Sequence, residues 1–395
     1  MKPRVHVRAA RRGARRRTAC GWGERAAGIV ATPLALAVLA AVALPAAPAA
    51  RSTLSAQARE MDYHGHFAVF TGQGRPASLD DIAAAMKDAE AVLVGEIHTD
   101  PVGHWIEAEL LRRALQAFHV GQPSGALRPV ALSLEMFERD VQDVLDEYLA
   151  DLITEKQFKA GARPWEYYDS DYRPMVEAAK AAHVPVIAAN APRRYVNRVT
   201  RLGRDALLAL PDRARSFLAP LPYPQPTDAY RAEWNALMSD MPTTPPCTPP
   251  MKADAAPGGG AAPHRPSPKT AGAAKAPPAH KPRAKMPMHN GSFMENALQA
   301  QTLWDATMAY AVTTYLEDHP GGLVLHMVGG FHVQNFTGIP EKIEFYRPGT
   351  RRVVVSMDTA DDFATFDASE YAGRGDFVIL TDKSLDQDYA RNCLR

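Results

Sequence analysis

Residues 91–98 read AVLVGEIH, an apolar run that closes with a Gly-x-x-His turn ending at His98. Residues 323–332 read LVLHMVGGFH and close in the same way at His332. Short apolar runs that stop at glycine and polar residues are typical of strands buried on both faces of a parallel sheet. The two segments therefore predict two such strands, each followed by a turn that presents an imidazole.

Four further apolar runs have the length of strands, at residues 129–134, 184–188, 352–357 and 377–380. Helical patterns lie between most of the runs and cover residues 105–118, 141–149, 175–183, 195–210 and 293–316. Strands that alternate with helices predict an α/β fold in which helices flank a mainly parallel sheet. The last two runs have a short, Asp-rich connection, so we expect them to form an antiparallel edge.

Residues 1–50 differ in composition from the rest of the chain. Nine Lys/Arg and one Glu fall within residues 1–25, followed by an apolar stretch at 27–44 and by Ala-Pro-Ala at 47–49. This order is typical of a secretory signal peptide, so we expect export to the periplasm, the cell envelope or the medium. A retained membrane anchor is the alternative, although the apolar core falls short of the roughly 20 residues that span a bilayer.

Residues 242–290 are rich in Pro, Ala, Gly and Lys and contain no aromatic residue. Such a segment cannot bury enough apolar surface to offset its ordering entropy, so we expect a disordered insertion. It would divide a single α/β domain into a first part, residues 51–241, and a second part, residues 291–395. Basic residues are concentrated in the insertion and in residues 1–50, whereas the whole chain has a net charge of +1. The remainder is therefore acidic, which argues against a nucleic-acid partner.

Polar side chains follow four of the predicted strands. In open parallel sheets ligands bind beyond the carboxyl ends of the strands, so we expect these side chains to meet in one crevice. Imidazoles ligate metals and act as general bases, and carboxylates complete metal sites or carry protons. The candidates are Glu96, His98, Glu135, Asn190, Arg193, Arg194 and His332.

Two further histidines lie near or within these runs. His104 lies six residues beyond His98 at the start of a predicted helix, where it either faces the same crevice or caps the helix. His326 falls inside an apolar run, so we expect it to be a buried core histidine.

Five segments resemble, in the right order, the ChaN-like haem-binding family of the Tiki/TraB superfamily. They are VLVGEIHTDPVGHW (92–105), ALSLEMFERDVQDVLDEYL (131–149), DYRPMVEAAKAAHVPVIAANAPRRYVNRV (171–199), LWDATMAYAV (303–312) and HMVGGFHVQNFTGIPEKI (326–343). The resemblance implies an α/β fold, an extracytoplasmic location and a role in haem binding or iron uptake. It leaves membrane-associated uptake machinery and a homodimer open as partners.

We therefore expect an exported protein that binds haem or another small ligand. Haem needs an apolar slot, an axial ligand and cations for its propionates. The aromatic residues Trp165, Tyr167, Tyr168 and Tyr172 either form this slot or pack in the ordinary way. Arg173, Arg193 and Arg194 are the candidate cations.

The alternative is a hydrolase, either metal-free or dependent on a divalent metal. The resemblance implies it too, because distant superfamily members include metalloproteases and esterases with paired Gly-x-x-His motifs. Glu96, His98, Glu135 and His332 would then be catalytic, with His98 and His332 as candidate metal ligands. Polar residues that converge on one crevice suit both classes, so the sequence does not decide between them.

Overall fold

Eight strands form one sheet in the computed structural model, which describes residues 63–120, 127–240 and 291–385. Their order across the sheet is β2-β1-β8-β7-β3-β6-β4-β5. From β8 to β5 all neighbours are parallel, whereas β1 runs antiparallel to β2 and to β8. The strands are β1 (Phe67–Thr71), β2 (Pro76–Ala77), β3 (Ala91–Glu96), β4 (Val130–Glu138), β5 (Val186–Asn190), β6 (Leu323–Gly329), β7 (Arg352–Ala360) and β8 (Phe377–Asp382).

All six strands predicted from apolar runs are present. The expected antiparallel edge at the last two is wrong, because β7 and β8 are parallel. Parallel neighbours need a crossover of a dozen or more residues, and residues 361–376 provide one that contains the short helix α11 (Ala368–Tyr371). The antiparallel edge is formed instead by β1 and β2, which the apolar runs did not predict.

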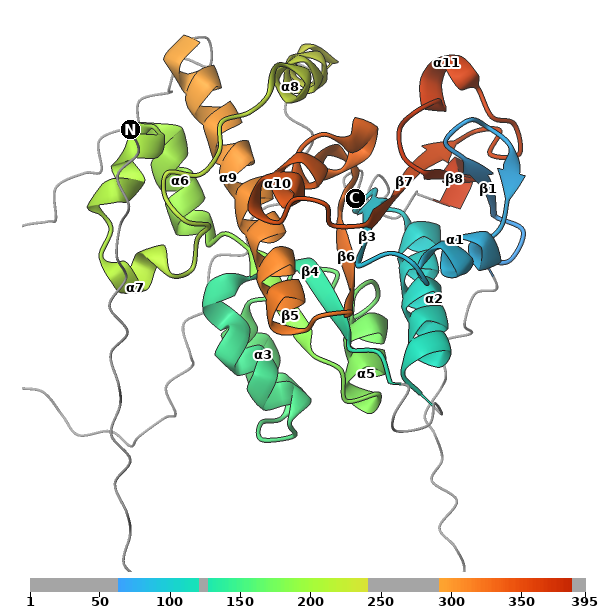
Figure 1. Ribbon diagram of the computed structural model, residues 1–395, viewed down its shortest axis with the longest axis horizontal. Helices are drawn as coiled ribbons and strands as arrows, with labels where there is room; N and C mark the ends of the chain where they lie inside the picture. Colours follow the sequence, from blue (N-terminus) through green and yellow to red (C-terminus); the bar gives the residue numbers. More distant parts are fainter. Residues whose placement is uncertain (1–62, 121–126, 241–290, 386–395) are drawn as a thin grey trace, which may run out of the picture. The chain divides into compact units, whose positions relative to one another are not determined.

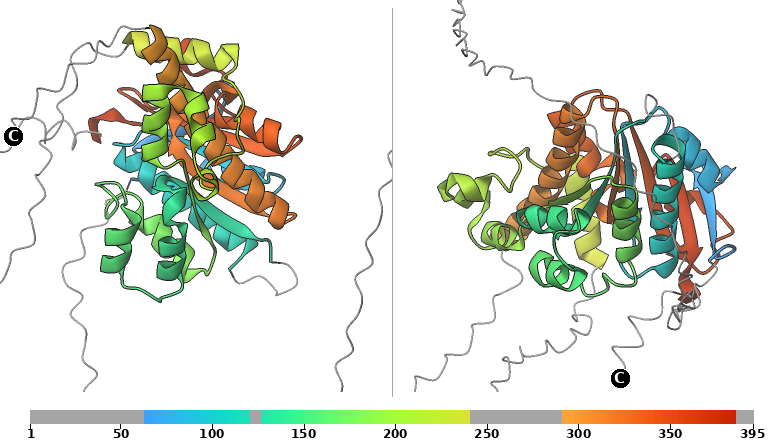
Figure 2. Two further views of the ribbon diagram at one scale, coloured as in Figure 1. Left: turned by 90° about the vertical axis from the view of Figure 1, so that its left-hand side faces the viewer. Right: turned by 90° about the horizontal axis from the view of Figure 1, so that it is seen from below.

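Helices cover both faces of the sheet, as predicted (Figure 1). Helices α1, α2 and α5 pack on one face and α9 and α10 on the other; Figure 2 shows the strands between α2 and α9. The remaining elements are α1 (Leu79–Ala85), α2 (Pro101–Phe118), η1 (Arg139–Val141), α3 (Gln142–Leu149), α4 (Glu155–Ala162), α5 (Arg173–Ala181), α6 (Arg193–Leu202), η2 (Arg204–Ala209), α7 (Asp212–Arg215), α8 (Asp228–Asp240), α9 (Gly291–Asp318), η3 (Gly330–His332), η4 (Gln334–Phe336), α10 (Ile339–Tyr346) and η5 (Lys383–Leu385).

The sheet separates two apolar cores. Successive side chains of a strand point to opposite faces, so Val92 and Val94 of β3 pack in the core beneath α2. Ala91 and Leu93 pack in the core beneath α9. A strand that is buried on both faces needs apolar residues at every position, which explains the uninterrupted run in the sequence.

Helix boundaries follow local signals that the apolar pattern alone does not give. Helix α2 begins four residues before the predicted start, where the side chain of Asp100 accepts the N–H of Val102 and Pro101 occupies the first turn. The helix predicted to reach residue 210 ends at Leu202, because Gly203 has a φ of 79° and the chain continues as a 3₁₀ turn.

No helix within the described ranges is long and apolar enough to cross a membrane. The predicted leader and the predicted insertion lie outside the described residues, so both stay predictions. The sheet takes β1 to β5 from residues before the insertion and β6 to β8 from residues after it.

Candidate functional site

A cavity of about 840 Å³ lies at the carboxyl ends of β3, β4, β5 and β6. The two strands with Gly-x-x-His turns are direct neighbours, as predicted, and Glu96 of β3 lies opposite Gly329 of β6. The fold therefore gathers side chains that are far apart in the sequence. The predicted residues that line the cavity are Glu96, His98, Glu135, Asn190, Arg193 and His332.

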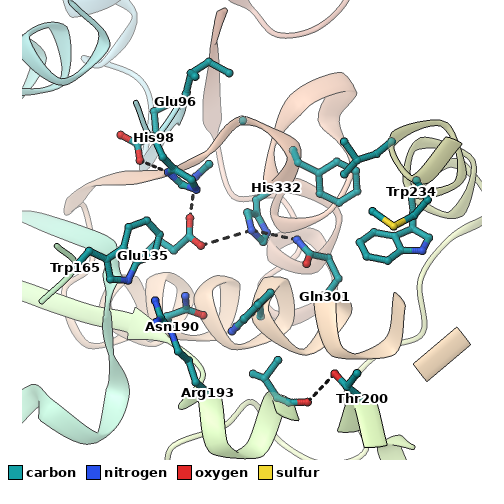
Figure 3. A pocket seen from close by; sticks show the side chains of 18 of the residues that line it. Glu96, His98, Glu135, Trp165, Asn190, Arg193, Thr200, Trp234, Gln301 and His332 are labelled. Carbon is teal, nitrogen blue, oxygen red and sulfur yellow. Dashed lines mark hydrogen bonds and ion pairs between the residues drawn. The ribbon is translucent and has the colours of Figure 1, made fainter. Parts of the chain in front are cut away.

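His98 is oriented by a carboxylate from its own turn. Its Nδ1 lies 2.6 Å from Oε1 of Glu96. The imidazole packs against Gly329, where an added Cβ atom would come within 2.9 Å of Nε2. The absence of a Cβ atom at Gly329 thus leaves the space that the imidazole of His98 occupies. Figure 3 shows the carboxylate of Glu135 between His98 and His332, and its Oε2 accepts the backbone N–H of Gly329 at 2.8 Å.

His332 is oriented by a carboxylate from a distant helix. Its Nδ1 is hydrogen-bonded to Oδ1 of Asp305 on α9, and both side chains are buried. Its Nε2 lies 3.7 Å from Oε1 of Glu135 and 3.2 Å from the amide of Gln301. Carboxylates and imidazoles therefore alternate at the inner end of the cavity, in the order Glu96, His98, Glu135 and His332, and the buried Asp305 lies behind His332.

The carboxylates favour the protonated form of both imidazoles. Burial by itself would lower the pKa of His332, but Glu135 and Asp305 outweigh it and raise the pKa to about 9. Burial opposes the charged form of His98 as well, yet Glu96 and Glu135 raise its pKa above the ordinary value. These carboxylates therefore favour the cationic form of His332 at neutral pH.

A second group of ionisable side chains lies behind Glu96 and does not line the cavity. Oε2 of Glu96 is 2.9 Å from Nδ1 of His104, and that Nδ1 is 3.3 Å from Oε2 of Glu107. The hydroxyl of Tyr172 donates to Oε1 of Glu96 at 3.0 Å. His104 thus neither lines the cavity nor caps α2, since Asp100 is the N-cap.

These contacts separate the pKa values of the two buried carboxyl groups. Burial would raise the pKa of Glu96, but His104 and His98 outweigh it and lower the pKa to about 2. Glu107 has weaker compensation, so burial and the negative charge of Glu96 raise its pKa well above the ordinary value.

The outer part of the cavity is mainly apolar and is bounded by α6 and α8. Arg193, the one Lys or Arg on its lining among the described residues, lies 5.7 Å from the ring centroid of Trp165. Oδ1 of Asn190 is buried and has no hydrogen-bond partner within the described part of the chain. The large apolar residues on the lining are Trp165, Val196, Trp234, Leu237, Met238, Trp304 and Phe331.

Two of the predicted cations lie outside the cavity. Arg173, at the start of α5, pairs with Glu155 at 2.6 Å, and Arg194 pairs with Asp140. Neither side chain belongs to the lining of the cavity. The expectation that Arg173 and Arg194 belong to the ligand site is therefore corrected.

The remaining predicted residues divide between core and cavity. His326 is a buried core histidine, as predicted, with its Nδ1 2.9 Å from the hydroxyl of Ser133. The aromatic patch is not one slot: Trp165 lines the cavity, whereas Tyr168 and Tyr172 are buried in the core beneath α2.

Asp305, Gln301 and Glu107 are among the polar residues of the site that were not predicted from the sequence. Asp305 stands inside LWDATMAYAV, and an acid among apolar residues of a helix signals a buried pair. Glu107 follows His104 by three residues, a spacing that places both on one helix face. The α8 residues of the outer lining carry no comparable signal, because their apolar pattern is that of any amphipathic helix.

These features define an α/β protein with alternating carboxylates and imidazoles at the carboxyl ends of its strands. The model of the family "Haem-binding uptake, Tiki superfamily, ChaN" matches residues 82–343, and the chain belongs to this family. No curated protein matches the chain.

Three solved structures resemble the fold. ChaN of Campylobacter jejuni, in a structure of cofacial haem binding, is 15% identical with a TM-score of 0.51, over 80% of this chain and 97% of that one. The type III effector HopBA1 is 11% identical with a TM-score of 0.38, over 77% and 93%. A mutant of the erythromycin esterase EreC in its open conformation is 10% identical with a TM-score of 0.36, over 74% and 77%. The first of these confirms the predicted α/β fold.

Proposed function

We propose that this protein binds haem in the cavity at the carboxyl ends of β3 and β6, and that it is exported and serves haem or iron uptake. Membership of a family of haem-binding uptake proteins supports the ligand. The signal-peptide pattern of residues 1–50 supports export. Membrane-associated uptake machinery and a second copy of the chain are the partners that such a role would involve.

The lining of the cavity fits haem in three respects. Its volume of about 840 Å³ falls within the range of roughly 300–1,000 Å³ for small-molecule sites. The apolar outer wall suits the faces of a porphyrin, and Arg193 offers a cation to a propionate. The lining offers His98 and Met238 as iron ligands, whereas Asp305 and Glu135 favour the protonated form of His332.

His98 is our candidate for the axial ligand. Its side chain is 45% exposed, compared with 7% for His332, so it is the imidazole that a ligand reaches first. Glu96 engages Nδ1, so iron would be bound by Nε2, the nitrogen beside Gly329 and Glu135 (Figure 3). An accessible imidazole with a fixed orientation at the base of an apolar-walled cavity is the observation that carries this proposal.

A haemin titration followed by visible absorption tests it. Wild-type protein should develop a Soret band that saturates at a fixed stoichiometry. The His98→Ala variant should bind haemin at least about tenfold more weakly and with a shifted Soret maximum, since an iron ligand is lost. His319→Ala, which removes an exposed histidine at the end of α9, is the matched control. Absence of a saturable band in the wild type would refute the proposal.

A hydrolase is a second candidate, favoured by the alternation of carboxylates and imidazoles. Glu96 and Asp305 each hold an Nδ1, so that two imidazoles flank Glu135 at one end of a cavity. Such a group can activate water directly or through a divalent metal. Hydrolysis of an ester and peptide panel, measured with and without Mn²⁺ or Zn²⁺, tests it. Hydrolysis that is lost in His332→Ala would support a hydrolase. Absence of turnover across the whole panel would refute it.

A further inference from the structure

Glu96, His104 and Glu107 form a group that meets the cavity at Glu96 alone and has the composition of a cation site. Glu96, His104 and Glu107 are all buried, with exposed fractions of 1%, 4% and 0%. One ligand atom from each lies within 4.8 Å of the other two. His104 and Glu107 come from one face of α2, and Glu96 comes from the end of β3, so the group joins the helix to the sheet.

Two carboxylate oxygens of this group lack a hydrogen bond in the ranges that the structure describes, although Oε2 of Glu96 lies 2.9 Å from Nδ1 of His104. Oε1 of Glu107 and Oε2 of Glu96 are buried and have no hydrogen bond among the described residues. Asp171 adds a third acid, with Oδ2 3.6 Å from Nε2 of His104. Within the described part of the chain no Lys or Arg forms an ion pair with these three acids. Two imidazoles, those of His98 and His104, are their only cationic neighbours there, and buried carboxylates with incomplete compensation are costly.

The orientation of His104 is that of a metal ligand. Its Nε2 lies 3.2 Å from the backbone carbonyl of His98, the kind of contact that fixes the tautomer of a ligating histidine. The other nitrogen, Nδ1, is directed at Glu96 and Glu107. Tyr172 donates to Oε1 of Glu96 and leaves Oε2 on the side of His104. Each of these two ligands is thus held in place by a neighbour that would not itself touch the ion.

The spacing also suits an ion. A first-row metal about 2.0–2.2 Å from each ligand atom separates those atoms by roughly 3.0–3.6 Å. The distances from Nδ1 of His104 to the two carboxylates are 2.9 and 3.3 Å. One imidazole and two carboxylates are donors that Zn²⁺, Mn²⁺ and Fe²⁺ accept, whereas Cu⁺ prefers sulfur.

We propose that Glu96, His104 and Glu107 bind one divalent first-row transition metal ion, distinct from the haem cavity. Oε2 of Glu96 serves this ion, while Oε1 continues to orient His98. The ion supplies the positive charge that the buried carboxylates lack, and it ties α2 to the carboxyl end of β3. Glu96 is then a shared residue that connects the metal site to the cavity.

Zinc binding to chelator-treated, haem-free protein tests this proposal. Isothermal titration with Zn²⁺, together with metal analysis after gel filtration, should give one tightly bound equivalent per wild-type chain. Glu107→Gln keeps the volume of the side chain and removes a ligand charge, and it should weaken zinc binding at least about 100-fold, since even outer contacts of a metal site cost 10–100-fold. Glu109→Gln, on the same helix but paired with Arg112 at the surface, should bind as the wild type does.

Two further variants locate the ion. His104→Asn removes the imidazole ligand and should lose the same equivalent, which keeps the test decisive if Glu107→Gln fails to fold. The His98→Ala/His332→Ala variant should retain it, because those imidazoles face the cavity. If both Glu107→Gln and His104→Asn retain the zinc equivalent, or if the wild type binds none tightly, the three residues form an ion-pair cluster and the proposal is wrong. The haemin titration of the wild type reports on the proposed function separately, so one proposal can fail without the other.

Discussion

The two Gly-x-x-His turns are alike in sequence but differ in how the protein supports them. At the end of β3, His98 is half exposed, and its partner Glu96 is two residues earlier in the same turn. At the end of β6, His332 is buried, and its partner Asp305 comes from α9. One imidazole is thus positioned locally and is accessible to a ligand, while the other is positioned by tertiary packing and shielded from solvent.

The Gly-x-x-His motif therefore determines where an imidazole lies, but it does not determine how much that imidazole contributes to the free energy of unfolding. Loss of His98 should cost little stability, because the imidazole is half exposed and its buried partner Glu96 keeps its contacts with His104 and Tyr172. A buried pair is sensitive to the loss of either partner, because the remaining charge stays in a low-dielectric interior. The two histidines should therefore respond differently to the same substitution.

The largest effect is expected for stability. His332→Gln leaves the carboxylate of Asp305 buried with less compensation, so the free energy of unfolding should fall by about 3 kcal/mol. His98→Gln should lower it by about 1 kcal/mol or less, since the side chain is partly solvated. Urea denaturation of both variants measures the difference.

The exposed His319 offers a matched control for this comparison. His319→Gln should change the free energy of unfolding by no more than about 0.5 kcal/mol, as expected for a surface position. Equal losses for His98→Gln and His332→Gln would contradict the contrast between the two turns.

The pH dependence of the free energy of unfolding should show an effect of similar size at His332. The pKa of His332 is about 9 in the folded protein, above the ordinary value of 6.5. A raised pKa contributes stability that is complete below pH 6.5 and is lost as the pH rises through 9, a change of about 3 kcal/mol. Urea midpoints between pH 6 and 10 should therefore decline more steeply for the wild type than for His332→Gln. Parallel curves would show that the imidazole is not held protonated by Asp305 and Glu135.

Much of this arrangement was predictable because strand ends are encoded locally. An apolar run followed by Gly and polar residues predicted both strands, and the rule that ligands bind at carboxyl ends predicted one shared crevice. Glu96, Glu135, Asn190 and the two histidines lie on its lining for that reason.

The rest could not be predicted because it depends on packing between distant segments. Nothing near Arg173 in the sequence indicates that Glu155 pairs with it. Nothing near His332 indicates Asp305, which reaches it only because α9 packs against β6. The outer wall from α8 is similar, since an amphipathic pattern does not say which element its apolar face contacts.

The smallest expected effect concerns whether the two turns act together on a ligand. Glu135 lies between His98 and His332, so removing one imidazole changes the charge that the other experiences. We expect the haemin affinity of His98→Ala/His332→Ala to be no lower than that of the weaker single variant, with a coupling energy of about 1 kcal/mol. Haemin dissociation constants for the four proteins of the cycle measure it, and a cycle that pairs His98→Ala with His319→Ala should be additive. Additive losses in the first cycle as well would mean that the two histidines serve separate sites, despite their place in one cavity.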